Sequence, residues 1–136
     1  MNPKLSPEAL AHHSVVALHD LIAAVFTGAA SAQSAYAQLL QHFDPEFNMV
    51  TISGAKVNLA AVTQLFYSGL GKRPDLVISI SHVTTLSVAE DQVWVQYQET
   101  HTLGEVETRR VAVAQVQVSA DGQWRWRYLH ETPVLA

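Results

Sequence analysis

Three residues suited to acid–base chemistry, Tyr97, Glu99 and His101, alternate along one apolar segment. In a β-strand such residues share one face of the sheet. A buried glutamate beside a histidine could have a raised pKa and act as a general base, while His101 or Tyr97 donates a hydrogen bond to an oxyanion. The alternative is a polar patch that faces water or a second subunit. Glu99 and His101 are therefore the candidate catalytic residues.

The closing segment, residues 123–132, has two different faces if it is a strand. One face would carry Trp124, Trp126, Tyr128, His130 and Thr132, and the other Arg125, Arg127, Leu129 and Glu131. The aromatic face suits a ligand pocket or a subunit interface. Together with a helical phenylalanine and an arginine of the preceding strand, the candidate ligand-binding residues are Tyr97, Arg110, Trp126, Arg127, Tyr128, His130 and Phe66.

The hairpin at Asp121-Gly122 decides which face of this segment points inward. A two-residue turn pairs Trp126 with Gln117, whereas a three-residue turn with a glycine bulge pairs it with Val116. The bulged register gathers apolar residues on one face and is favoured. It predicts that Arg127 lies beside Gln115.

Seven histidines raise the question of a metal site. His82, His101 and His130 fall on three predicted strands and would make an acceptable zinc set with Glu99 if they converged. However, no two histidines are four residues apart, as helical ligands often are, and there is no cysteine. The sequence therefore predicts no metal and no cofactor.

Composition excludes several classes of protein. The 136 residues carry a net charge of −4, and no run of basic residues exceeds two, so no nucleic-acid partner is predicted. The apolar stretch Val15–Phe26 is shorter than the roughly 20 residues needed to cross a bilayer, and residues 1–13 do not resemble a signal peptide. We expect a cytoplasmic protein with no membrane partner.

The elements that must position these residues follow from two periodicities. Helical spacing of apolar residues predicts a helix from Ser6-Pro7 to Gly28, a second from Ser31 to Asp44-Pro45, and a third that ends near Gly69. A short strand is predicted at Phe47–Ile52. Two-residue alternation then predicts four long strands at residues 77–88, 93–103, 110–118 and 123–132. These elements indicate one α+β domain over residues 1–136, with three helices packed in a strongly curved antiparallel sheet.

This element order resembles that of the nuclear transport factor 2-like cone fold. The closing Asp121-Gly122-Gln123-Trp124-Arg125, with His130 and Thr132, resembles the ending of SnoaL-like domains and of their uncharacterised bacterial relatives. It is also similar to the association domain of calcium/calmodulin-dependent kinase II. The resemblance implies a pocket inside the cone, a homodimer and a bacterial source.

The sequence departs from two branches of that fold. The steroid isomerase branch uses an aspartate base with a tyrosine–aspartic acid pair, and here the strand residue best placed for acid–base work is Glu99. The pocket arginines of the kinase association domain align with Glu99, Gln115 and Glu131. Neither set of functional residues is carried over.

Three functions remain in view. The first is a homodimeric module that binds a small apolar or amphipathic molecule in an aromatic pocket. The second is an isomerase, cyclase or dehydratase that uses Glu99 with His101 or His130. The third is a dimerisation scaffold without a ligand, in which a charge at Trp126 would break the dimer.

Overall fold

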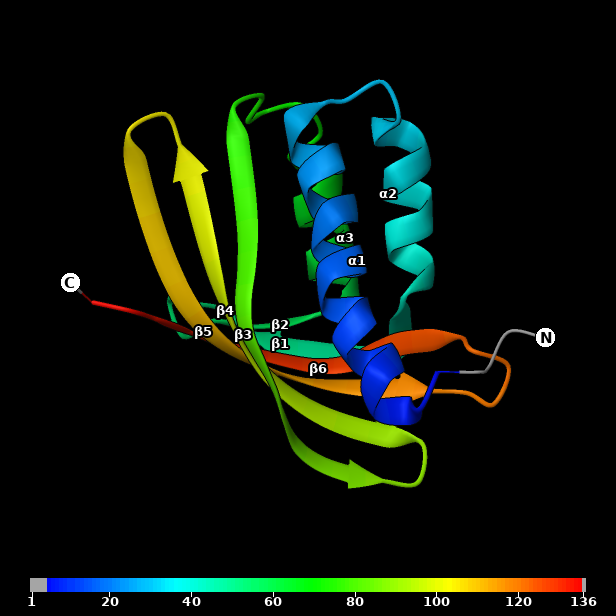
Figure 1. The fold of residues 1–136 in the computed structure, drawn as a ribbon. Helices are drawn as coiled ribbons and strands as arrows, with labels where there is room; N and C mark the ends of the chain where they lie inside the picture. The colour runs from blue at the N-terminus through cyan, green and yellow to red at the C-terminus, as the bar shows by residue number, and fades with distance from the viewer. Residues whose placement is uncertain (1–4, 136) are drawn as a thin grey trace.

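The computed structural model describes residues 5–135, which form three helices and one six-stranded sheet. The elements are α1 (Pro7–Thr27), α2 (Ala32–Gln41), β1 (Phe43–Val50), β2 (Lys56–Asn58), α3 (Leu59–Ser68), β3 (Leu76–Ala89), β4 (Gln92–Leu103), β5 (Val106–Val118) and β6 (Trp124–Pro133). Figure 1 shows the long strands bending around the helices, so that the sheet forms a cone whose concave face covers α1. The predicted α+β class and curved sheet are confirmed.

The sheet has the strand order β2-β1-β6-β5-β4-β3. The four long strands pair antiparallel, as alternation predicts, but β1 pairs parallel to β6. β1 begins at Phe43 rather than Phe47, and Pro45 falls where the β1–β6 register shifts, so its missing N–H interrupts no regular ladder. The three-residue β2 was not predicted, because two-residue alternation is not detectable over so short a segment.

The helix ends mostly follow the predicted capping residues. The Ser6 hydroxyl accepts a hydrogen bond from the Ala9 amide at 3.1 Å, and Gly28 ends α1 in the left-handed conformation. Ser31 precedes α2 but makes no side-chain cap. In α3 the cap is Asn58, whose side chain accepts from the Ala61 amide at 3.0 Å.

The length argument against a membrane span was wrong. At 21 residues, α1 is long and apolar enough to cross a bilayer by length and composition, and it is the one such helix among residues 5–135. Its apolar stripe is buried inside the cone, where Val15 and Leu18 are at most 1% exposed. In this structure α1 is the core helix around which the sheet curves.

A bulge in β6 decides which residues enter the core. Trp126 pairs with Val116, as the bulged register predicts, but the next pair is Gln115 with Tyr128. Arg127 is therefore the extra residue, and its predicted place beside Gln115 was wrong. Since the bulge shifts the alternation by one, Trp124 and Trp126 share the concave face with Leu129 and Glu131.

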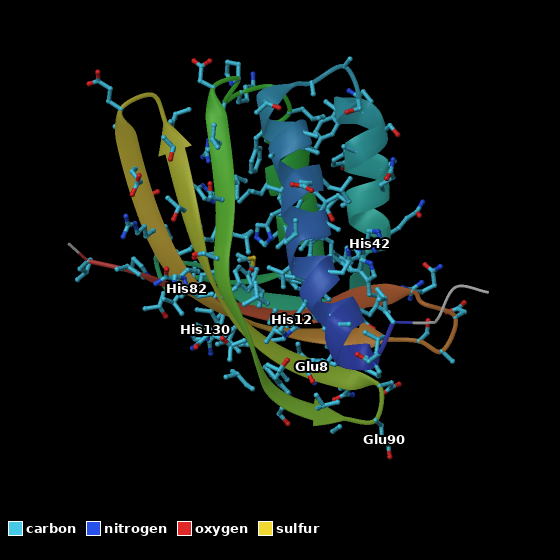
Figure 2. All side chains as sticks on the ribbon, in the orientation of Figure 1. Glu8, His12, His42, His82, Glu90 and His130 are labelled. Atoms are coloured by element: carbon cyan, nitrogen blue, oxygen red, sulfur yellow. The ribbon has the colours of Figure 1, made fainter. Side chains whose placement is uncertain are left out.

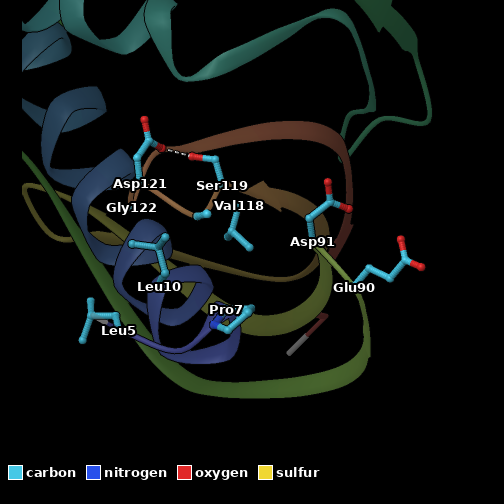
Figure 3. Close-up of a pocket in the computed structure, with 10 residues that line it drawn as sticks. Leu5, Pro7, Leu10, Glu90, Asp91, Val118, Ser119, Asp121 and Gly122 are labelled. Atoms are coloured by element: carbon cyan, nitrogen blue, oxygen red, sulfur yellow. Dashed lines mark hydrogen bonds between the residues drawn. The ribbon is translucent and has the colours of Figure 1, made fainter. Parts of the chain in front are cut away.

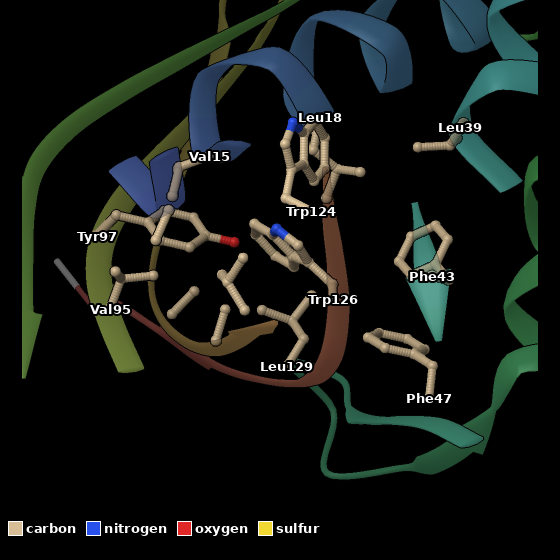
Figure 4. Packing of buried hydrophobic residues seen from close by; sticks show 14 of the residues in the cluster. Val15, Leu18, Leu39, Phe43, Phe47, Val95, Tyr97, Trp124, Trp126 and Leu129 are labelled. Atoms are coloured by element: carbon tan, nitrogen blue, oxygen red, sulfur yellow. The ribbon is translucent and has the colours of Figure 1, made fainter. Parts of the chain in front are cut away.

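Trp126 lies at the centre of the core and is fully buried. Its indole Nε1 donates to Ser14 Oγ of α1 at 3.0 Å, and that hydroxyl donates to the Ala11 carbonyl oxygen at 2.7 Å. Figure 4 shows Trp126 between Tyr97 on one side and the phenylalanines of β1 on the other. The tryptophan thus anchors α1 to the sheet by packing and by a hydrogen bond.

Candidate functional site

A cavity of about 750 Å³ lies between the helices and the concave face of the sheet. Its walls are apolar and come from α1, β1 and α3, with Phe26, Phe43, Phe47, Met49 and Phe66 among them. Its polar lining on the sheet consists of Glu99, His101, Arg110 and Glu131. Size and polarity are those of a small-molecule site, which is typically an apolar hollow with a few polar groups.

Neighbouring strands and α1 bring the polar residues together. Glu99 on β4 pairs with Arg110 on β5, and His101 follows Glu99 on the same face of β4. His19 enters from α1, and its Nε2 lies 3.0 Å from Glu99 Oε1. His101 Nε2 donates to the other carboxylate oxygen, Glu99 Oε2. The carboxylate of Glu99 is therefore held between two imidazoles.

His19 is charged in this arrangement. Its Nδ1 lies 2.7 Å from the Val15 carbonyl oxygen, which can only accept, while Nε2 faces a carboxylate. Both ring nitrogens thus face acceptors, which only the imidazolium suits. Burial alone would lower the pKa of His19, but hydrogen bonding and the charge of Glu99 outweigh burial and raise it. His19 has no nitrogen left for a ligand.

Glu99 is ionised and does not have the raised pKa expected of a buried base. Burial pushes its pKa upwards, but hydrogen bonds from His101 and His19, together with the charge of His19, hold it well below the usual range. The prediction of a raised pKa was wrong, because it considered one histidine on the same strand and not the second from α1. A carboxylate of such low basicity serves better to orient a histidine than to take up a proton.

His101 is the member of this cluster with a nitrogen to spare. Its Nε2 is held by Glu99, and Nδ1 makes no hydrogen bond to any residue of 5–135. The side chain is 13% exposed and lines the cavity. When His101 is neutral and its Nε2 proton is donated to the carboxylate, Nδ1 has a lone pair and can accept a hydrogen bond.

Arg110 and Glu131 form a second, looser pair beside the first. Arg110 Nη1 lies 3.4 Å from Glu131 Oε1 and 3.5 Å from Oε2, and both side chains are largely buried. Burial and the charge of Glu99 raise the pKa of Glu131, and Arg110 offsets only part of that. The pKa values of Glu99 and Glu131 are thus shifted in opposite directions.

Tyr97 lies deeper than the cavity surface. Its ring packs edge-on against His19, with centroids 5.3 Å apart, and its hydroxyl is buried without a hydrogen-bond partner. Burial and the nearby charges of Glu99 and Glu131 raise its pKa well above the usual value, so the hydroxyl keeps its proton. Tyr97 belongs to the wall behind the site.

The predicted ligand-binding residues divide into three groups. Phe66 and Arg110 line the cavity. Trp126 supports it from the core, whereas Arg127 faces outward and its Nη1 lies 3.0 Å from Glu46 Oε2. The prediction that Tyr128 and His130 line the cavity was wrong.

Tyr128 and His130 lie on the convex face because of the β6 bulge. Tyr128 pairs with Gln115 and His130 with Val113, and the Tyr128 hydroxyl and His130 Nδ1 are 3.0 Å apart. His82 is exposed on β3 at a residue with a positive φ of 55°. Figure 2 labels His82 and His130, neither of which lies with Glu99 and His101 in the cavity lining. The zinc set considered from the sequence therefore does not converge, and no group of metal-binding geometry occurs within residues 5–135.

His19 is the residue of the site that the sequence did not reveal. It lies on a helix, 80 positions before Glu99, and the order of residues does not show that the two side chains meet. One signal was present: His19 follows Val15 by four and Leu18 by one, within the apolar stripe of α1. A histidine in such a stripe needs a buried partner.

A second hollow of about 510 Å³ lies at the other end of the molecule. Figure 3 shows it between the start of α1 and the β3–β4 and β5–β6 turns, where Ser119 donates to Asp121. Its lining includes Leu5, Pro7 and Glu90 but no histidine or arginine. It offers none of the convergent polar groups of the larger cavity.

No protein-family model and no curated protein matches the chain, but solved structures do. An NTF-2-like protein of unknown function from Pseudomonas aeruginosa is 26% identical, with a TM-score of 0.88 over 93% of this chain and 99% of that one. A candidate association domain of calcium/calmodulin-dependent protein kinase type II from Thiobacillus denitrificans is 18% identical, with a TM-score of 0.67 over 99% and 100%. A candidate ketosteroid isomerase from Shewanella frigidimarina is 11% identical, with a TM-score of 0.70 over 96% and 100%.

Proposed function

We propose that this chain, which has the nuclear transport factor 2-like fold, binds a small apolar or amphipathic molecule in the cavity of the cone. The observation that supports this most is the cavity itself, about 750 Å³ with several phenylalanines in its wall and a group of polar residues on the sheet. Burial of apolar ligand surface there would contribute about 25 cal/mol per Å². The closing motif favours the SnoaL-like branch of the fold, and the absence of cysteine suits a cytoplasmic location.

A cavity-filling variant tests this proposal. Val62 of α3 is buried and lines the cavity, so Val62→Trp places an indole where the ligand would lie. Native mass spectrometry of the purified protein, followed by denaturing analysis, should find a small bound mass in wild type and less of it in the variant. The matched control is Val106→Trp, at a valine that is 64% exposed and outside the lining. Equal retention by both variants would count against the cavity as the binding site.

The arrangement of Glu99 and His101 supports a second candidate function, acid–base catalysis of the isomerase, cyclase or dehydratase kind. In it His101 takes the proton through Nδ1, while Glu99 holds the other nitrogen and stabilises the imidazolium. A suitable probe is 2-tetralone, an apolar ketone whose α-protons exchange with D₂O and are followed by NMR. Wild type should accelerate the exchange and His101→Asn should not, whereas His13→Asn, at an exposed histidine, should match wild type. Exchange at the buffer rate would remove this candidate.

Self-association through the convex face of the sheet is the third proposal. Trp94 and Tyr128 lie there with ring centroids 6.0 Å apart, beside half-buried Val113 and Gln115. Aromatic residues on such a face are typical of subunit interfaces. Two neighbours of this fold are kinase hub or association domains, which is consistent with assembly by the same fold.

A further inference from the structure

The unsatisfied polar atoms of the interior are concentrated in one place. Within residues 5–135, three buried side-chain atoms lack a hydrogen-bond partner: Tyr97 Oη, Glu99 Oε1 and Arg110 Nε. Glu99 and Arg110 line the cavity and Tyr97 lies behind it, and all three belong to the adjacent strands β4 and β5. Glu99 Oε1 is compensated by the charged His19, whose Nε2 lies 3.0 Å away, so Tyr97 Oη and Arg110 Nε are the two donors left without any partner. Buried polar groups are rarely left unpaired, so the missing hydrogen bonds of this cluster point to a partner that is not part of the chain.

The rest of the core shows that this capacity is local. The indole of Trp126 is paired with Ser14, and Ser14 with a carbonyl oxygen, although both residues are fully buried. His19 is likewise paired at both nitrogens. The fold therefore satisfies its buried polar groups elsewhere, and leaves donors unmatched only beside the cavity.

His101 and Arg110 are the most exposed of the polar residues that the sheet contributes to the cavity lining. His101 is 13% exposed and Arg110 16%, whereas Glu99 is 4% exposed and the Tyr97 hydroxyl is enclosed. In the neutral form whose Nε2 proton is donated to Glu99, His101 offers Nδ1 as an acceptor. Arg110 offers donors, since its bonds to Glu131 are long and Nε has none. An acceptor and a donor thus lie on neighbouring strands at the same end of an apolar hollow.

We propose that the ligand carries a neutral hydroxyl group, which donates to His101 Nδ1 and accepts from Arg110, with its apolar body among the phenylalanines. A hydroxyl is both donor and acceptor and satisfies both residues. An ether or ketone could only accept and would leave His101 unmatched. A carboxylate would meet Arg110 but has no proton to donate, so it too would leave His101 Nδ1 unmatched. This inference rests on the proposed binding function and specifies the chemical class of the ligand.

Three probes of one shape test the inference: naphthalene, 2-naphthol and 2-naphthoate, titrated at pH 7 by isothermal calorimetry. Naphthalene measures the apolar cavity alone. One well-made pair of hydrogen bonds in a buried site contributes roughly a factor of ten in affinity. We expect 2-naphthol to bind about tenfold more tightly than naphthalene, and 2-naphthoate to gain nothing over naphthalene.

Two variants test whether His101 and Arg110 cause the preference for 2-naphthol over naphthalene. His101→Phe removes the acceptor and keeps an aromatic ring, and Arg110→Met removes the donor and keeps the chain length. Each should reduce 2-naphthol to the affinity of naphthalene without changing naphthalene itself, which shows that the cavity persists. His13→Phe, at an exposed histidine, is the control and should retain the preference. If one variant fails to fold, the other still decides the question.

The outcomes separate this inference from the proposed function. Equal affinities for naphthalene and 2-naphthol would overturn the inference that the ligand carries a hydroxyl group. The cavity would still be a binding site, and its unpaired polar atoms would bind enclosed water only. Tightest binding of 2-naphthoate would overturn it in favour of an anion. Failure of all three probes would remove both the inference and the aromatic cavity on which it rests.

Discussion

His19 Nε2 and Glu99 Oε1 lie 3.0 Å apart, although one belongs to the first helix and the other to β4. Both side chains are at most 5% exposed, so the pair is an ionic link inside the cone. It joins α1 to the concave face of the sheet next to the point where Trp126 bonds to Ser14. Such a pair is costly to break, because the remaining partner is left as a buried charge.

Glu99→Gln should destabilise the fold by about 3 kcal/mol, since His19 loses its counter-charge in a buried site. Urea denaturation followed by tryptophan fluorescence measures this change in the free energy of unfolding. The control is Glu107→Gln, where the exposed carboxylate lies 3.0 Å from Arg109 Nη2. That substitution should cost under about 1 kcal/mol. Similar losses for the two variants would contradict the buried ion pair.

The pH dependence of stability should change sign in the same variant. In wild type the raised pKa of His19 means that its stabilisation is complete below about pH 6.5 and is lost as the pH rises through the folded-state value. In Glu99→Gln burial, the largest influence on His19, is opposed only by the Val15 hydrogen bond and the charge of Glu131. The pKa of His19 should therefore fall below its ordinary value, and stability should instead rise with pH towards 6.5. Melting temperatures between pH 5.5 and 8.5, compared as variant minus wild type, test this. A parallel pair of curves would show that Glu99 does not control His19.

Trp126 and Ser14 should be energetically coupled through their 3.0 Å hydrogen bond. Trp126→Phe, Ser14→Ala and the double variant form a cycle in which the coupling free energy should be about 1 kcal/mol. Trp126→Phe alone should cost about 2 kcal/mol or more, because a cavity is added to the lost bond. A second cycle of Trp124 with Ser14, which share no hydrogen bond in the structure, provides the baseline and should show no coupling of that size.

Gly28 should tolerate a side chain less well than Gly54, although both have a positive φ, of 70° and 85°. A Cβ on Gly28 would lie 2.9 Å from the Gly71 Cα, whereas nothing lies within 4 Å of one on Gly54. Gly54→Ala should cost about 1 kcal/mol from backbone strain alone. Gly28→Ala should cost at least another 1 kcal/mol, because two backbone segments must move apart. Equal melting temperatures for the two variants would rule out this close approach.

The convex face, rather than Trp126, is the place to test self-association. A charge at Trp126 was expected to break a dimer, but the residue is fully buried in the protomer, so a charge there would unfold the chain. Trp94→Glu changes the convex face while leaving the core intact. We expect sedimentation velocity to show a dimer for wild type and a monomer for Trp94→Glu, with Val88→Glu, at an exposed valine of the edge strand β3, as control. A monomeric wild type at micromolar concentration would overturn the dimer.

Much of the architecture was predictable because it depends on local rules. The start of α1 follows from Ser6 and Pro7, its end from Gly28, and the long strands from two-residue alternation of apolar side chains. The shared face of Tyr97, Glu99 and His101 follows from the same period. Each of these features depends on residues a few positions apart, so the order of amino acids alone determines it.

The chemistry of the site was decided by contacts that the sequence order does not contain. One extra residue at Arg127 turned Tyr128 and His130 away from the cavity, and only pairing of β6 with β5 shows where a bulge falls. The curvature of the sheet around α1 brought His19 against Glu99, which reversed the expected pKa shift. Amino-acid order determined which groups are present and which faces they share. Tertiary structure decided which of them meet, and electrostatic shifts depend on distance in space rather than along the chain.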